Sequence, residues 1–124
     1  MTTADEEDLS VSRLTERGAT VVALQGLIDI NTVEQLAKAI DGAIQADRPL
    51  VIDLAEIESL DSTGLRVLLD ARSAMLRRNE PLAVVCDAHG SIAKMLDVAG
   101  AGRFLHIYAT RAEALDGIGA QSRS

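Results

Sequence analysis

The 124-residue sequence contains few cysteine, histidine and aromatic residues, and each shortage excludes a class of protein. Its single cysteine, Cys86, forms no intrachain disulfide, and with only His89 and His106 beside it there is no zinc-ligand spacing. We expect Cys86 to be an unreactive core residue and the two histidines to be turn or surface residues. The only aromatic residues are Phe104 and Tyr108, and 19 acidic residues outnumber 12 basic ones, for a net charge of -7. Such a chain repels phosphate and offers no stacking platform, so we expect no nucleic-acid partner.

Long apolar runs are also absent, since none approaches the roughly 18 residues of a membrane span. Residues 1–8 carry acids where a signal peptide would carry bases, so we expect a cytoplasmic protein with no membrane partner. The polar segment 1–8 and the small, polar segment 117–124 show no periodicity. We therefore predict a disordered acidic N-terminus, one domain over 9–116 and a flexible C-terminal tail. A domain of this size needs no metal or cofactor to hold its core.

The apolar periodicity predicts an α/β domain. Two β-rich runs on either side of a turn at 16–18 predict a hairpin, and apolar runs over 50–54, 82–86 and 104–108 predict further strands. Helical spacing predicts four helices: three with Asn31, Ser91 and Thr110 as N-caps, and one that begins near Ser62. Ile92, Leu96 and Val98 are expected to form the apolar face of the helix capped by Ser91. This order predicts a mixed, mostly parallel sheet that opens with a β-hairpin and carries about four helices.

Known nucleotide and phosphate-transfer patterns do not fit the sequence. It contains no Gly-Lys-Ser or Gly-Lys-Thr, and the segment 100–102 lacks the third glycine of a dinucleotide site. Asp53 is the one acid in the apolar run 50–54, and a receiver domain places its phosphorylated Asp after its third strand. A receiver also needs an acidic pair at the end of its first strand and, late in the chain, a lysine beside the phosphoryl group. Here the acids of segment 5–8 precede the first predicted strand, and segment 104–110 contains no lysine. We therefore expect Asp53 to bond to nearby backbone.

The run 60–65, Leu-Asp-Ser-Thr-Gly-Leu, is the segment with the strongest functional signal. Asp and Ser cap helices in many folds, so the run taken alone predicts only the start of a helix. Its predicted place, in a strand-to-helix loop at the carboxyl edge of the sheet, puts an exposed hydroxyl beside the positive end of a helix dipole. Ser62 is therefore a candidate phosphate acceptor.

Together with the runs 50–54 and 26–32, this loop resembles the STAS domain of bacterial anti-sigma factor antagonists. The resemblance extends from about Leu9 to Leu115 and implies a STAS-type fold. In that family the serine directly after the Asp of an Asp-Ser-Ser/Thr-Gly-Leu run is phosphorylated, which by resemblance selects Ser62 over Thr63. The family's Gly-Glu-Leu-Asp segment matches the chain except at Leu27, where the family usually has Glu.

The resemblance implies a partner-switching cycle. The unphosphorylated protein would bind an anti-sigma factor serine kinase and so release a sigma factor. Phosphorylation at Ser62 would switch this binding off, and a separate phosphatase would remove the phosphate. The protein would be a binding module, with no enzyme activity and no cofactor. The implied switch surface consists of Asp29, Asn31, Thr32, Asp61, Ser62, Thr63 and Gly64.

Three points stay open at this stage. The module could be a constitutive STAS scaffold or a lipid-transport-associated domain that phosphorylation does not regulate. It could also be a hydrolase if the fold brought His89 to Ser62. Finally, Asp29 follows the second predicted strand, and its carboxylate is expected to accept hydrogen bonds either from loop N–H groups or from the Ser62 hydroxyl.

Overall fold

The computed structural model describes residues 8–122 and begins with the predicted hairpin. Strand β1 (Leu9–Glu16) pairs antiparallel with β2 (Ala19–Ile28). The two residues between them, Arg17 and Gly18, both have positive φ, 53° and 80°. Turns with two positive φ values match the right-handed twist of paired strands, so this short connection fixes the register of the hairpin.

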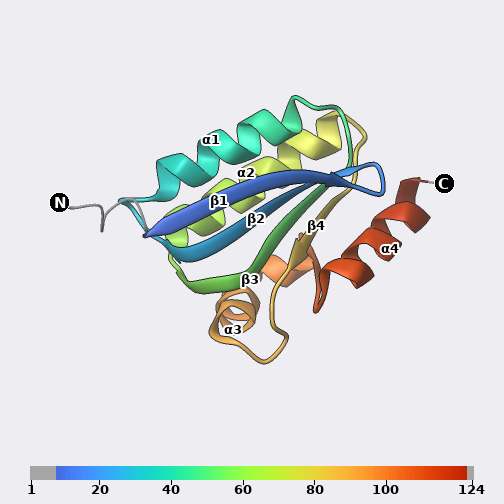
Figure 1. Ribbon diagram of the computed structural model, residues 1–124. Helices are drawn as coiled ribbons and strands as arrows, with labels where there is room; N and C mark the ends of the chain where they lie inside the picture. The colour runs from blue at the N-terminus through green and yellow to red at the C-terminus, as the bar shows by residue number, and fades with distance from the viewer. Residues whose placement is uncertain (1–7, 123–124) are drawn as a thin grey trace.

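Helices and strands then alternate along the chain (Figure 1). In order they are α1 (Val33–Ile44), β3 (Leu50–Leu60), α2 (Ser62–Arg77), β4 (Leu82–Val85), α3 (Ser91–Val98), the 3₁₀ turn η2 (Ala101–Arg103), β5 (His106–Tyr108) and α4 (Arg111–Ser122). The sheet order is β1-β2-β3-β4-β5, and β2 to β5 run parallel. The predicted fold class, a mostly parallel sheet opening with a hairpin and carrying four helices, is confirmed for the described residues.

The sheet separates two hydrophobic clusters. The larger one joins one face of the sheet to α1, α2 and α3, and includes Leu36, Leu68 and Leu96, each with no exposed surface. The smaller one joins the other face to α4, through residues such as Val51 and Leu115. Figure 1 shows α1 and α2 on one side of the sheet and α4 on the other. Burial on both faces explains why β3 and β4 begin as unbroken apolar runs.

The last helix corrects the predicted C-terminal tail. α4 continues through residue 117 to Ser122, because Ile118 is 4% exposed and packs in the smaller cluster. The two glycines of this segment lower helix propensity and so concealed the helix in the sequence. At Gly117 a Cβ would meet the Tyr108 hydroxyl at 2.1 Å, so that glycine serves close packing. The remaining predicted terminal residues, 1–7 and 123–124, lie outside the described residues.

The helix starts confirm one predicted cap and correct two. The N–H of Glu113 donates to the Thr110 hydroxyl at 3.1 Å, as predicted for α4. The N-cap of α1 is Thr32 rather than Asn31. The N-cap of α3 is Gly90 rather than Ser91, because Asp87 organises the preceding turn by accepting hydrogen bonds from the two residues before the helix.

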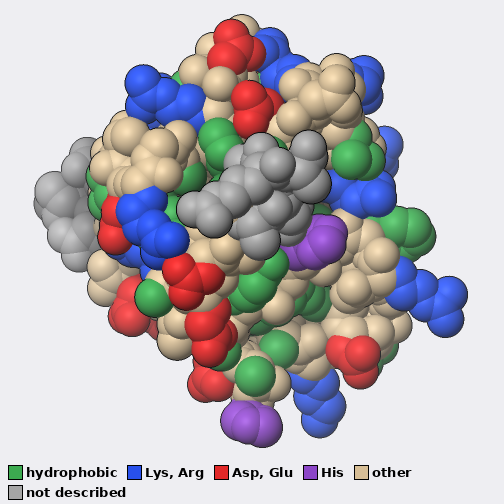
Figure 2. Space-filling model, turned by 90° about the vertical axis from the view of Figure 1, so that its right-hand side faces the viewer, with side chains coloured by type: hydrophobic (Ala, Val, Ile, Leu, Met, Phe, Trp, Pro, Cys, Tyr) green, Lys and Arg blue, Asp and Glu red, His purple; other side chains and the backbone are tan. Residues whose placement is uncertain are grey.

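Two surface properties complete the description. None of the helices within residues 8–122 combines the length and the hydrophobicity that crossing a membrane requires. Figure 2 shows the end of the molecule at the right of Figure 1, where the hairpin turn lies. Acidic and basic side chains are interspersed there, with hydrophobic side chains scattered among them.

Candidate functional site

Two of the predicted switch segments meet at the carboxyl edge of the sheet. The last paired residues of β2 and β3 are Ile28 and Leu60, so Asp29 and Asp61 begin neighbouring loops. The N–H of Asp61 donates to the carbonyl oxygen of Ile28 at 3.1 Å and ties the two loops together. Both loops lie at the same end of the sheet (Figure 1). The parallel pairing of β2 and β3 thus brings segments 29–32 and 61–64 side by side.

Asp61 is the N-cap of α2. One of its carboxylate oxygens, Oδ1, accepts hydrogen bonds from the N–H groups of Thr63 at 3.0 Å and Gly64 at 3.2 Å, and from the Thr63 hydroxyl. The hydroxyl bond from Thr63 is the main reason that the pKa of Asp61 is lowered, and the two backbone N–H groups act in the same direction. Asp61 is therefore ionised at neutral pH, and its negative charge lies at the positive end of the α2 dipole.

The two hydroxyls of the loop differ in their freedom to react. Thr63 uses its hydroxyl as a donor to Asp61, and that side chain is half-buried. Ser62, the first residue of α2, is exposed, and no hydrogen bond engages its side chain among residues 8–122. Because Asp61 caps the helix, the Ser62 hydroxyl is not needed for capping and is accessible from solvent.

Gly64 allows α2 to begin directly on the ends of two strands. A Cβ at this position would lie 2.4 Å from Leu60 Cδ1 and 2.5 Å from Ile28 Cγ2. Both of those side chains are buried, so they have little room to move aside. The glycine therefore lets the first turn of α2 pack closely against Leu60 and Ile28, and this packing positions Ser62 at the edge of the sheet.

The neighbouring loop is held by Thr32, which is 2% exposed. Its hydroxyl accepts from the N–H of Asp29 at 3.0 Å and donates to the carbonyl oxygen of Leu27 at 2.8 Å. Asp29 in turn accepts from the N–H of Asn31 at 2.9 Å. Of the two partners expected for Asp29, the loop N–H is found, and no hydrogen bond to Ser62 occurs in the described structure. Thr32 thus holds this loop from beneath, and Asn31 is exposed on its surface.

A groove of about 570 Å³ lies beside Ser62, between α2 and α3. Its walls are mainly apolar side chains, and its lining consists of Leu60, Asp61, Ser62, Leu65, Ser91, Lys94, Met95, Val98 and Ala99. Val98 was predicted to face the core and instead is 81% exposed. The exposure of Val98 was predictable from the sequence, because Val98 lies about 200° around the helix from the buried Leu96. The groove itself is formed by two helices and is not visible in either segment alone.

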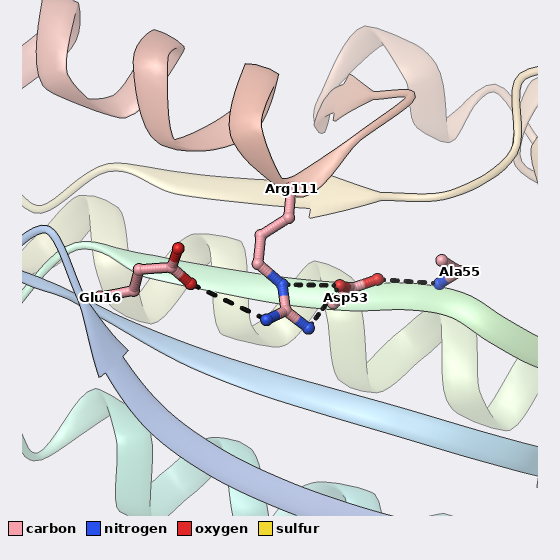
Figure 3. A network of polar contacts seen from close by, with 4 residues as sticks. All are labelled: Glu16, Asp53, Ala55 and Arg111. Atoms are coloured by element: carbon pink, nitrogen blue, oxygen red, sulfur yellow. Dashed lines mark hydrogen bonds and ion pairs between the residues drawn. The ribbon is translucent and has the colours of Figure 1, made fainter.

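Asp53 belongs to a separate polar network (Figure 3). Its carboxylate accepts from the N–H of Ala55 at 3.0 Å, which confirms the predicted backbone bond. The sequence did not indicate its second partner, Arg111, whose guanidinium donates from Nε and Nη2, each at 3.0 Å. Arg111 also lies 3.8 Å from Glu16, so it links α4 to β3 and β1. This arrangement fastens α4 to the sheet and accounts for Asp53 without any phosphate chemistry.

Two other candidate chemistries have no counterpart at the loop. His89 lines a different depression, beside Gly90 and Asp97, and no hydrogen bond joins it to Ser62 within residues 8–122. In the same part of the chain, no three His, Cys, Asp or Glu side chains gather closely enough to hold a metal ion. Ser62 is thus an exposed hydroxyl at the edge of a mainly apolar groove.

Comparisons with known proteins agree with this architecture. The family model described as STAS domain matches residues 11–114. The anti-sigma-F factor antagonist RsfB of Mycobacterium tuberculosis is 32% identical over 115 residues, which cover 90% of this chain and 91% of RsfB. An anti-sigma F factor antagonist of Paenibacillus polymyxa is 28% identical over 110 residues, which cover 87% and 93% of the two chains. The crystal structure of an anti-sigma factor antagonist from Mycobacterium paratuberculosis has a TM-score of 0.83 and 25% identity, covering 95% of this chain and 98% of that one.

Proposed function

Because this chain belongs to the STAS domain family, we propose that it is an anti-sigma factor antagonist whose binding is switched by phosphorylation of Ser62. In its unphosphorylated form it binds an anti-sigma factor that is also a serine kinase, so that a sigma factor is released. Phosphorylation of Ser62 dissociates this complex, and a separate phosphatase restores the binding form. We place this exchange in the cytoplasm, where transcription takes place.

The observation that carries the proposal is the contrast between Ser62 and Thr63. Ser62 presents an exposed, unengaged hydroxyl at the first position of α2, whereas the Thr63 hydroxyl is bonded to Asp61. The positive end of the α2 dipole favours an added negative group at the first residue of the helix. The fold can therefore accept the modification at Ser62 with little change in shape.

The switch follows from charge. A phosphate adds about -1.5 to -2 charge at neutral pH. Ser62 follows Asp61, and Asp29 begins the adjacent loop, so the new charge joins two carboxylates at one end of the sheet. A partner surface complementary to the unmodified loop then meets repulsion and the cost of desolvating the phosphate. ATP and its magnesium ion belong to the kinase in this scheme, and this chain acts by binding alone.

The test compares charge and hydroxyl at one position. We expect Ser62→Ala to bind the anti-sigma kinase of the same organism stably and to escape phosphorylation, and Ser62→Asp to bind at least tenfold more weakly. Ser73, exposed further along α2, supplies the matched control, because Ser73→Asp adds the same charge about 16 Å away. Affinities come from calorimetry, and the phosphorylated residue from tandem mass spectrometry.

A different outcome would support the alternative role. Equal kinase affinity for Ser62→Ala and Ser62→Asp, with both variants folded by circular dichroism, would indicate a constitutive scaffold. Phosphate found on a residue other than Ser62 would retain the switching role but move the acceptor.

A further inference from the structure

Two strongly exposed hydrophobic side chains lie at the end of the molecule that carries Ser62. Among the described residues, the two large hydrophobic side chains with the highest exposed fractions are Val98, at 81%, and Ile30, at 73%. Ile30 lies in the loop that begins beside Asp61, and Val98 lines the groove that contains Ser62. Exposed hydrophobic side chains that gather near one polar site are typical of a surface that binds another protein.

The groove between α2 and α3 combines an apolar lining with two charged side chains, Asp61 at the start of α2 and Lys94 on α3. Leu60, Leu65, Met95 and Val98 are among its apolar lining residues, and Lys94 lies in its lining on the α3 side. Lys94 is exposed and makes no ion pair within residues 8–122, in a chain whose net charge is -7. A ligand that fits this groove therefore offers apolar side chains together with a carboxylate.

The position of Ser62 identifies which macromolecule carries that ligand. Asp61 and Ser62 form part of the groove lining, so any protein whose active site reaches the Ser62 hydroxyl also covers the groove. The occupant of the groove and the kinase are then the same protein. This step rests on the proposed function.

We propose that the groove between α2 and α3 is a docking site for the anti-sigma kinase, which inserts apolar side chains against Val98 and Met95 and places a carboxylate near Lys94. The acceptor loop consists of residues 60–65 and contains Ser62. α3 thereby supplies affinity that this loop alone lacks. The contact is separate from the phosphorylated residue, so it determines which kinase binds and not whether Ser62 is chemically competent.

The experiment uses the kinase that phosphorylates the wild-type protein at Ser62. We expect Val98→Glu and Lys94→Glu each to weaken kinase binding at least tenfold and to slow phosphorylation of Ser62, because the hydroxyl is unchanged but docking is impaired. Val98→Ala tests the same site with no added charge and is expected to weaken binding about threefold or more. Both positions are exposed, so the variants remain folded.

The matched control is Leu76→Glu. Leu76 is 57% exposed on α2, but it lies about 21 Å along the helix from Ser62 and lines a different cavity. Its replacement introduces the same charge on an exposed aliphatic residue and is expected to leave kinase affinity unchanged. Hydrogen exchange on the wild-type complex gives a second measurement, with protection expected in α3 around Lys94 to Val98.

The outcomes separate this inference from the function on which it rests. Wild-type binding together with unchanged affinity of the Val98 and Lys94 variants would overturn the docking site and leave the phosphorylation switch intact. Equal loss in Leu76→Glu would also overturn it, since the effect would then be general charge repulsion. Failure of the wild-type protein to bind any anti-sigma kinase of its organism would overturn the proposed function and this inference together.

Discussion

Asp61 shows how one carboxylate oxygen organises the acceptor loop. It accepts hydrogen bonds from two backbone N–H groups and from the Thr63 hydroxyl. Asp61 therefore caps α2 and at the same time engages the one hydroxyl that is next to Ser62 in the loop. The capping bond replaces water on N–H groups that have no partner within the helix. A single short side chain therefore fixes the start of the helix and leaves Ser62, not Thr63, with an unengaged hydroxyl.

The same hydrogen bonds predict a pH effect. The pKa of Asp61 is lowered mainly by the Thr63 hydroxyl, so Thr63→Val is expected to raise it towards the ordinary Asp value. The pKa of Asp61 is lower in the folded protein than in the unfolded chain, so the ionised carboxylate stabilises the fold. This stabilisation is fully present above the ordinary Asp pKa of about 3.9 and is lost as the pH falls through the folded value. Carboxyl carbon shifts followed by NMR titration measure the pKa directly. An unchanged value in Thr63→Val, with Thr63→Ser as the control that keeps the hydroxyl, would contradict this assignment.

Individual residues also mark the limit of sequence interpretation. The start of α2 in the run 60–65 was predictable because its signals are local: an acid, a serine and a glycine between an apolar strand and an amphipathic helix. Thr32 was not placed at the N-cap, because its burial depends on a bond to Leu27 in the strand before it. The exposure of Val98 and the role of Arg111 likewise depend on elements distant in sequence.

At the scale of elements, the contact between α2 and the ends of β2 and β3 controls the site. We predict that Gly64→Ala forces α2 away from Leu60 and Ile28, destabilises the protein by about 1–3 kcal/mol and slows phosphorylation of Ser62. Gly119→Ala is the control, since Gly119 lies in α4 and a Cβ there meets nothing within 4 Å. It is expected to be neutral or to stabilise by up to about 1 kcal/mol. Urea unfolding gives both values, and equal effects of the two substitutions would remove Gly64 from its positioning role.

The elements themselves were largely predictable, and their ends were not. Strand and helix periods differ, so the alternation over 50–98 identified two strands and two helices in the correct order. β3 extends to Leu60, beyond the predicted 50–54, because pairing with β2 continues past a register shift that breaks the apolar pattern. α4 extends to Ser122 because burial of Ile118 outweighs the low helix propensity of its glycines. In both cases tertiary contacts decided where an element ends.

At the scale of the whole molecule, the sheet separates stability from recognition. α4 is fastened to one face by Arg111 and Asp53, and the main core fills the other face. The acceptor loop and the groove lie at the carboxyl edge, where Leu60 belongs to the main cluster but Ser62 and Val98 do not. Because Ser62 is exposed, we expect phosphorylation there to change the charge of the surface with little change in the packing beneath it.

The labelling rate of the buried Cys86 thiol measures whether a change at Ser62 disturbs the main core. The thiol is 1% exposed in the main core, and burial, aided by the charge of Asp87, raises its pKa. Both effects suppress the thiolate, so labelling by a disulfide reagent at neutral pH requires the core to open. We predict native-state labelling at least about a thousandfold slower than in denaturant, since typical domains are stable by about 5 kcal/mol or more. Ser62→Asp is expected to label at the wild-type rate, because its added charge lies outside the core, whereas Gly64→Ala labels faster. Faster labelling of Ser62→Asp would mean that charge at the acceptor loosens the fold, and that the switch is conformational rather than a change in surface charge alone.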